Sequence, residues 1–221
     1  MKFEDVFNLI IPASFGAYED NDETTVMEEV YNQLNNSVRT AYGASQFVII
    51  FDDADEVVKI PFEGEWFYCD DNEDEAFDAF STDYSQLSVD VYNKAVDAGL
   101  TPLFAETRFL GYSANHYPLY AQKKVAASFA ETELEKDKIY KIPSKETIEM
   151  IRSNCYNTTS YAWRAFAIDW VGCAVETYGF EMVSDMMDFL DENGIDDLHR
   201  NNYGFDAEGR PIIFDYCGFD Y

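Results

Sequence analysis

Two neighbouring stretches decide the fold of this chain: residues 196–202, Asp-Asp-Leu-His-Arg-Asn-Asn, and residues 209–218, Gly-Arg-Pro-Ile-Ile-Phe-Asp-Tyr-Cys-Gly. The first stretch is a polar loop, and the second is an apolar run that ends at the carboxylate of Asp215. Between them, residues 203–205 lead into a turn rich in Asp and Gly. This pattern predicts a short hairpin whose second strand, 211–214, ends at Asp215.

The charge of the whole chain restricts its partners. The 221 residues include 15 Lys and Arg against 43 Asp and Glu, a net charge of −28. Such a surface repels phosphate backbones and anionic membranes, so we expect neither direct nucleic-acid binding nor membrane binding. Two interpretations remain: simple solubility, or imitation of DNA in the basic DNA-binding groove of a partner protein.

The remaining composition excludes further classes. With 47% apolar and 17% aromatic residues, the chain is not a disordered acidic tail. No apolar run is long enough to span a bilayer, and Glu4 and Asp5 stand where a secretory signal is basic, so we expect a cytoplasmic protein. The only histidines are His116 and His199, and no cysteine pair has zinc-site spacing. Free thiols are expected at Cys69, Cys155, Cys173 and Cys217.

The first half of the chain is predicted to be rich in strands. β-Branched and aromatic runs predict a hairpin of strands 46–51 and 56–62, with Lys59 in the second strand. A capping-box spacing predicts a helix over about 25–36. The dense acidic residues of 63–82 predict a solvated loop.

The pattern then becomes mixed and finally helical. The apolar spacing between Asp83 and Gly99 predicts a helix. The other predicted segments are strands 103–109 and 117–125, a charged connection over 128–142, and helices 144–153, 160–178 and 180–192. This order predicts an α+β protein with a β-rich N-terminal lobe, 1–127, and a helical C-terminal lobe, 128–221.

The loop and hairpin at the C-terminal end resemble the catalytic segment of kinase-like phosphotransferases, particularly the aminoglycoside and small-molecule branch. In that family D-L-H-x-x-N precedes a hairpin and a strand that delivers a metal-binding Asp. Asp197 and Asn202 have the five-residue offset of the motif, His199 occupies its histidine position, and Asp215 follows the apolar strand. Lys59, in Val-Val-Lys-Ile, is similar to the strand lysine of V-A-I-K.

The resemblance implies a protein-kinase-like two-lobe fold whose C-lobe is reduced, because the sequence ends shortly after Asp215. It implies ATP and Mg²⁺ as cofactors, since phosphoryl transfer needs an oriented hydroxyl and cations on the triphosphate. Asp197 would orient or deprotonate the acceptor, Lys59 would contact the phosphates, and Asn202 and Asp215 would hold Mg²⁺.

Several details of the implied site stay open. The segment 117–125 would be the hinge that meets adenine through its backbone. Asp83 and Asp90 are both candidates for the acidic partner of the lysine. No G-x-G-x-x-G loop precedes the predicted hairpin, and Tyr42-Gly43-Ala44-Ser45 is the nearest counterpart.

The sequence therefore indicates two alternative functions. The first is a small kinase-like protein that binds Mg-ATP and transfers the γ-phosphate to a protein or small-molecule hydroxyl. The alternative is an inactive pseudokinase or an acidic DNA mimic that acts by binding a partner protein, similar in charge and size to phage-encoded anti-defence proteins.

Overall fold

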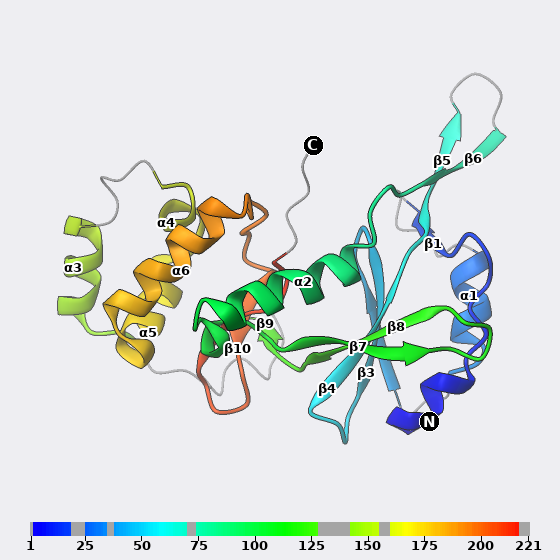
Figure 1. Ribbon diagram of the computed structural model, residues 1–221, viewed down its shortest axis with the longest axis horizontal. Coiled ribbons are helices and arrows are strands. Elements are labelled where there is room, and N and C mark those ends of the chain that lie inside the picture. The colour runs from blue at the N-terminus through cyan, green and yellow to red at the C-terminus, as the bar shows by residue number, and fades with distance from the viewer. Residues whose placement is uncertain are drawn as a thin grey trace. The chain divides into compact units, whose positions relative to one another are not determined.

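The computed structural model describes residues 2–18, 25–34, 38–69, 74–127, 142–154 and 160–216 (Figure 1). Helices and largely antiparallel sheets are combined, which confirms the predicted α+β class. The chain divides into two compact units: the first unit is Met1–Val89 with Thr107–Lys123, and the second unit is Asp90–Glu106 with Lys124–Tyr221. Among the described residues, no helix combines the length and the apolar character that crossing a membrane requires.

The first unit is built on a five-stranded antiparallel sheet with strand order β2-β3-β4-β8-β7. Its strands are β2 (Val38–Tyr42), β3 (Gln46–Phe51), β4 (Glu56–Pro61), β7 (Thr107–Tyr112) and β8 (Pro118–Lys123). The predicted hairpin of β3 and β4 is confirmed, and the two later strands lie within a few residues of their predicted bounds. Helix α2 (Tyr84–Asp97), also predicted, connects the first three strands to the last two.

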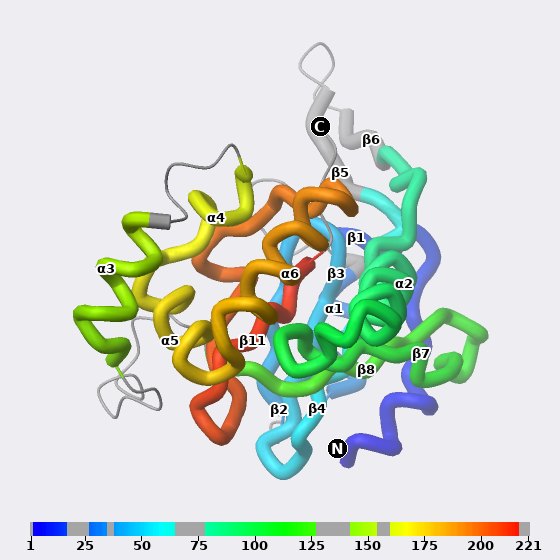
Figure 2. The backbone as a smooth tube through the Cα atoms, turned by 60° about the vertical axis from the view of Figure 1, so that its left-hand side comes forward, coloured from blue at the N-terminus to red at the C-terminus, as the bar shows by residue number. Residues whose placement is uncertain are grey.

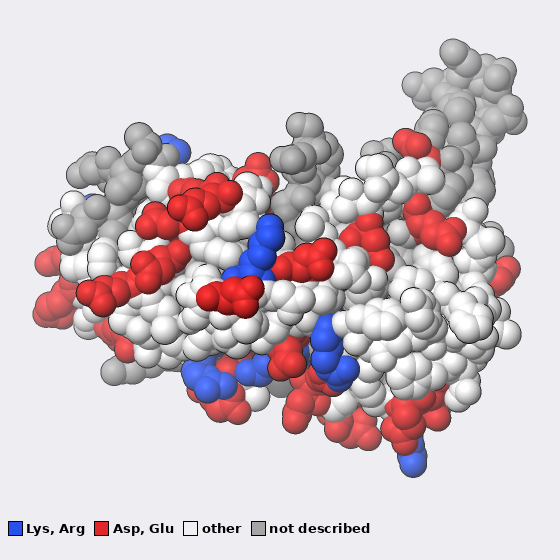
Figure 3. Space-filling view, in the orientation of Figure 1, with Lys and Arg blue, Asp and Glu red and all other residues white. Residues whose placement is uncertain are grey.

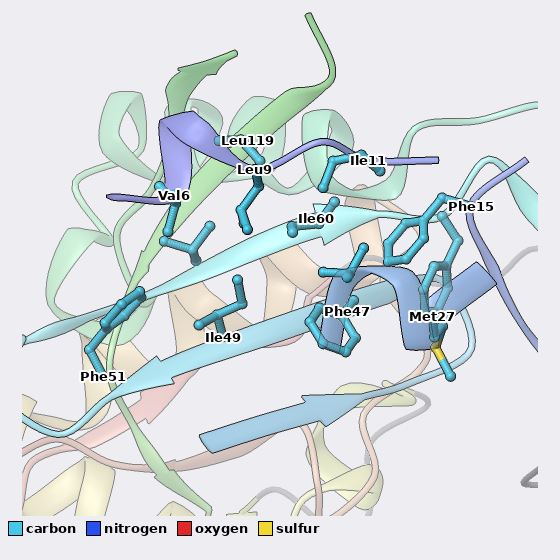
Figure 4. Packing of buried hydrophobic residues seen from close by; sticks show 13 residues of the cluster. Val6, Leu9, Ile11, Phe15, Met27, Phe47, Ile49, Phe51, Ile60 and Leu119 are labelled. Carbon is cyan, nitrogen blue, oxygen red and sulfur yellow. The ribbon is translucent and has the colours of Figure 1, made fainter. Parts of the chain in front are cut away.

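One face of this sheet carries the core of the first unit. The 3-10 helix η1 (Phe3–Asn8) and helix α1 (Thr25–Tyr31) supply the side chains that cover it. Figure 4 shows Leu9 near Ile60 on this face, and Met27 at the other end of the cluster near Phe15. Burying this apolar surface is the main favourable term in the folding of the unit. The predicted helix over 25–36 begins where expected but ends at Tyr31.

A second sheet contradicts the prediction that residues 63–82 form a loop. Strand β5 (Gly64–Cys69) pairs in parallel with β1 (Gly16–Tyr18) and antiparallel with β6 (Asp74–Ala79). The segment forms strands despite its acidic composition. Its aromatic run, Trp-Phe-Tyr at 66–68, has a high strand propensity.

Gly64 starts β5 at a point where there is no room for a side chain. A Cβ atom there would overlap the carbonyl oxygen of Asp78 and lie 2.8 Å from the Cα of Ala79, so backbone atoms would have to move. We expect Gly64→Ala to lower the free energy of unfolding by about 1–3 kcal/mol. Gly43→Ala is the matched control, because nothing lies within 4 Å of its Cβ position. Urea unfolding of both variants tests this, and equal stabilities would contradict the packing.

The second unit is mainly helical. Its helices are α3 (Lys145–Asn154), α4 (Ala162–Ala165), α5 (Ile168–Tyr178) and α6 (Phe180–Glu192), with the 3-10 helix η2 (Thr101–Leu103). A three-stranded sheet in the order β11-β10-β9 contains β9 (Ala126–Ala127), β10 (Tyr203–Phe205) and β11 (Pro211–Ile213). Figure 2 shows α5 and α6 side by side next to β11.

The predicted helix over 160–178 is interrupted between α4 and α5. Ala167 has an extended backbone (φ −64°, ψ 131°), and its N–H donates to the hydroxyl of Tyr203 at 2.9 Å. A side chain from the later hairpin therefore takes the donor that would continue the helix. The helices predicted over 144–153 and 180–192 are confirmed, whereas most of the predicted connection over 128–142 lies outside the described residues.

Candidate functional site

The predicted C-terminal hairpin is present as β10 and β11, paired from Tyr203↔Ile213 to Phe205↔Pro211. Its turn is organised by Asp206, which is buried. One carboxylate oxygen accepts the backbone N–H groups of Glu208 and Arg210 at 3.0 and 2.9 Å, and the other binds the Arg210 guanidinium. A buried carboxylate needs this many donors, so the turn has a single favoured arrangement.

The start of the hairpin is anchored on α5 by aromatic packing. The indole N–H of Trp170 donates to the carbonyl of Gly204 at 2.8 Å. The rings of Phe166 and Trp170 stack with centroids 4.8 Å apart, and the ring of Tyr203 packs at a tilt against both, at 4.8 and 5.0 Å. Phe166 and Trp170 are both buried in the core of the second unit. Their position shows that this core holds the loop that precedes the hairpin.

The end of the hairpin is anchored on the segment after η2. The N–H of Ala105 donates to the carbonyl of Ile213 at 2.7 Å, and the hydroxyl of Tyr216 donates to the carbonyl of Ala105 at 2.8 Å. The ring of Tyr216 also packs edge-on against Phe104, 5.3 Å between centroids. These contacts fix the backbone on both sides of Asp215.

Asn202 closes the polar loop that begins at Asp197. Its side-chain amide nitrogen donates to the backbone carbonyl of Asp197 at 2.6 Å and to its carboxylate oxygen Oδ2 at 3.1 Å. The side chain is 4% exposed, so these two bonds satisfy a buried donor. The five-residue offset between Asp197 and Asn202 is therefore the span of a closed loop.

The same asparagine also holds Asp215. The backbone carbonyl of Asn202 accepts the N–H groups of Phe214 and Asp215, both at 3.0 Å. Asn202 thus contacts Asp197 through its side chain and Asp215 through its backbone. The structure brings together three of the four residues that the sequence predicted for the site.

His199 lies on the outer side of this loop, facing Asp197. Its Nδ1 accepts the N–H of Asn201 at 3.2 Å, so the neutral ring carries its proton on Nε2. Nε2 is 3.5 Å from Oδ1 of Asp197. The two oxygens of the Asp197 carboxylate therefore face two nitrogen groups, the amide of Asn202 and the imidazole of His199.

Lys59, the fourth predicted residue, belongs to the first unit. It is 4% exposed in β4, where the register places it beside Val48 and Tyr120. Because side chains alternate along a strand, it lies on the sheet face opposite Val58 and Ile60, which join the core. Lysine side chains are rarely this buried, so Lys59 is not an ordinary solvent-exposed strand residue.

The two acids considered as partners of Lys59 differ in their surroundings. One oxygen of Asp83 accepts the N–H groups of Ser85 and Gln86, and the other accepts the hydroxyl of Tyr120 at 2.7 Å. Asp83 therefore caps the start of α2. Asp90 is exposed in the middle of α2. The choice between them stays a prediction.

The predicted hinge over 117–125 needs a correction, because most of this segment is strand β8. Residues Tyr120 to Gln122 pair with β4 on one side and β7 on the other. Backbone groups committed to two neighbours are unavailable to an adenine ring. Only Lys124 and Val125 lie between β8 and β9, so a backbone contact with adenine would have to come from there.

Two other kinds of site, a metal cluster of protein side chains and a reactive cysteine, were also considered in the described part of the chain. No three His, Cys, Asp or Glu side chains there are grouped so that they alone would hold a metal ion. Burial raises the pKa of the Cys173 thiol to about 11, so little reactive thiolate forms at neutral pH. In comparison with known proteins, no family model and no curated protein sequence matches this chain.

Proposed function

We propose that this protein binds Mg-ATP and transfers its γ-phosphate to a hydroxyl group of a protein or small molecule. The observation that carries the proposal is the bridge made by Asn202, which holds Asp197 and Asp215 in one rigid loop-and-hairpin unit. A base and a metal ligand must keep a fixed separation for an in-line displacement, and a buried asparagine that is bonded to both segments supplies that rigidity.

The donor set of this loop suits Mg²⁺. The amide nitrogen of Asn202 is committed to Asp197, so the amide oxygen is the atom left for a cation. Asp215 supplies a carboxylate at the end of β11. Magnesium in nucleotide sites commonly takes one or two protein oxygens, with phosphates and waters completing the octahedron. The bound ion would neutralise the charge that develops on the transferred phosphoryl group.

Asp197 is suited to orient the acceptor hydroxyl. Its two carboxylate oxygens face Asn202 at 3.1 Å and His199 at 3.5 Å. The Asp197 side chain is nevertheless 28% exposed. A half-exposed, oriented carboxylate can accept a proton from a bound hydroxyl. The role of Lys59, which belongs to the first unit, stays a prediction.

The order of elements supports a kinase-like two-lobe fold. A hairpin carrying Lys59 is followed by α2, by β8, by helices α3–α6, and then by the loop and Asp215. That is the order of the family that the sequence resembles. Gly43, in the nearest counterpart of the family's phosphate loop, lies in the turn between β2 and β3.

Calorimetric titration with ATP, with and without Mg²⁺, tests the proposal. We expect Mg-ATP to bind the wild type, and Asn202→Ala to weaken it at least about tenfold, because both the bridge and a metal ligand are lost. Asn201→Ala is the matched control, since its side chain is exposed one residue earlier. Equal affinities for the two variants, with both still folded by circular dichroism, would contradict the proposal.

The alternative, an acidic inhibitor of a DNA-binding protein, is favoured by the net charge of −28. Exposed acids also form a row along α6, where Figure 3 shows acidic side chains gathered, at Glu181, Asp185, Asp188 and Glu192. Like charges four residues apart destabilise an isolated helix by a few tenths of a kcal/mol, so the row is not explained by helix stability.

For such an inhibitor, binding to a basic DNA-binding protein is expected to weaken steeply between about 50 and 200 mM salt. Asp215→Ala should leave this binding unchanged, because the metal ligand takes no part in it. Binding that does not respond to salt in this range excludes the DNA-mimic function.

A further inference from the structure

Four aromatic rings form a continuous row on the first unit, along β7 and β8. Ring centroids are 5.7 Å apart for Tyr120 and Phe109, 5.1 Å for Phe109 and Tyr112, and 6.2 Å for Tyr112 and His116. Tyr120 is buried, but Phe109 is 42% exposed, Tyr112 is 55% exposed and His116 is also exposed. We call these four residues the aromatic row.

A β-bulge creates this row. Residues three apart in a regular strand point to opposite faces, yet Phe109 and Tyr112 are in ring contact. The register shifts between Phe109 and Gly111, so that Leu110 is inserted and packs toward the core. Gly111 has φ +144°, and a Cβ there would lie 3.0 Å from the ring of Phe7. Bulges often re-aim side chains near functional sites, and this one exposes two rings on one face.

The end of the row is held by a tight turn. His116 has a left-handed backbone (φ 65°), which is uncommon for a residue with a side chain. Its N–H donates to the carbonyl of Ser113, whose side-chain oxygen accepts the N–H of Tyr117. The turn keeps the imidazole beside Tyr112. The rings are therefore presented by a rigid backbone, which lowers the entropy that a partner must overcome.

The row lies on an edge of the sheet. Strand β7 is terminal in the strand order, and within the described ranges no strand pairs with it on the side away from β8. In Figure 3 an uncharged area covers much of β7 and β8, and basic side chains lie at its edge. Exposed aromatic groups of this kind mark contact sites more often than chance exposure does.

Charge decides which occupant fits. A second copy of this chain would bring another −28 charges, and a single-stranded nucleic acid would bring phosphates. The only basic residue of β7, Arg108, is paired with Glu56 at 2.8 Å, so the charge of its guanidinium is offset there. The Asp83 carboxylate accepts the hydroxyl of Tyr120 at the buried end of the row. The net charge of −28 therefore favours a partner that carries positive charge.

We propose that the aromatic row is a docking surface for an arginine-rich segment of a partner protein. A guanidinium group is planar, stacks on aromatic faces and carries the required charge, whereas an ammonium group is compact and more strongly hydrated. The proposal is independent of ATP binding, because it uses none of the residues of the loop-and-hairpin unit.

Octa-arginine and octa-lysine peptides test the proposal, because they carry the same charge and differ in their ability to stack. We expect the wild type to prefer octa-arginine, and Phe109→Leu with Tyr112→Leu to weaken its binding by about two- to fivefold for each ring. The binding of octa-lysine should weaken less in the same double variant. Tyr161→Leu is the matched control. This tyrosine belongs to the second unit and is 50% exposed, and its loss leaves the net charge unchanged.

Leucine keeps apolar bulk at both positions, and circular dichroism checks that the double variant is folded. An arginine preference that is the same in the wild type and the double variant would overturn the proposal. So would an oligothymidylate whose binding depends on the two rings, because that result would assign the row to nucleic acid.

Discussion

Asp197→Asn is expected to slow phosphoryl transfer from ATP by about 10²- to 10⁴-fold, the usual contribution of a positioned general base. Asparagine keeps the shape of the side chain but cannot accept the proton of the acceptor hydroxyl. It also places a second amide opposite the Asn202 amide, where a carboxylate oxygen now accepts at 3.1 Å. The transfer step should therefore suffer more than the binding of Mg-ATP.

The measurement is release of the radiolabelled γ-phosphate from ATP, whichever hydroxyl receives it. Asp196→Asn is the matched control, because it removes the same charge from the exposed neighbouring residue. A rate for Asp197→Asn that equals the rate of this control would remove Asp197 from the mechanism.

Trp170→Ala is expected to cost about 3–5 kcal/mol of unfolding free energy, the range for removing a buried aromatic side chain. Trp170 is 2% exposed, stacks on Phe166, packs at a tilt against Tyr203, and donates to Gly204. Its loss leaves a cavity and removes a hydrogen bond at Tyr203 and Gly204, the residues that follow Asn202. We therefore expect weaker Mg-ATP binding as well.

Thermal unfolding measures this effect, and for a chain of this size each kcal/mol corresponds to about 2–4 °C. Trp170→Phe separates the two contributions, because it preserves most of the stacking and removes the N–H donor. A melting temperature for Trp170→Ala within a degree of the wild type would contradict the role assigned to α5.

The polar loop could be predicted because its information is local. The offset between Asp197 and Asn202 reflects one closed loop, and the strand before Asp215 is short and strongly apolar. The hairpin of β3 and β4 was predictable for the same reason, since β-branched residues fill both strands. Local patterns of this kind do not depend on distant parts of the chain.

The predictions that were wrong share one cause, because each of these segments is shaped by tertiary contacts. The break before Ala167 depends on the hydroxyl of Tyr203, which lies 36 residues later. The pairing of β5 with β1 joins segments that no local pattern connects. The hinge was misplaced because β8 is paired on both sides, and strand order is invisible in a short run of residues.

The aromatic row illustrates the same limit. Phe109 and Tyr112 have a spacing that predicts opposite faces, and only the inserted Leu110 brings the rings together. Gly111 is the one local signal, because an isolated glycine inside a strand pattern suggests a bulge. The two predicted lobes and their boundary at residues 127 and 128 stay a prediction.

Thermal unfolding of the wild type and Asp215→Ala, with and without Mg-ATP, tests the central claim most directly. A ligand at about 100 times its dissociation constant stabilises the folded state by roughly 2.7 kcal/mol. For a chain of this size that corresponds to a shift of about 5–10 °C. Magnesium alone and ATP with a chelator are the controls. The account predicts a shift in the wild type that requires both Mg²⁺ and Asp215. Cooperative unfolding with no shift in the wild type, or an equal shift in Asp215→Ala, would contradict it.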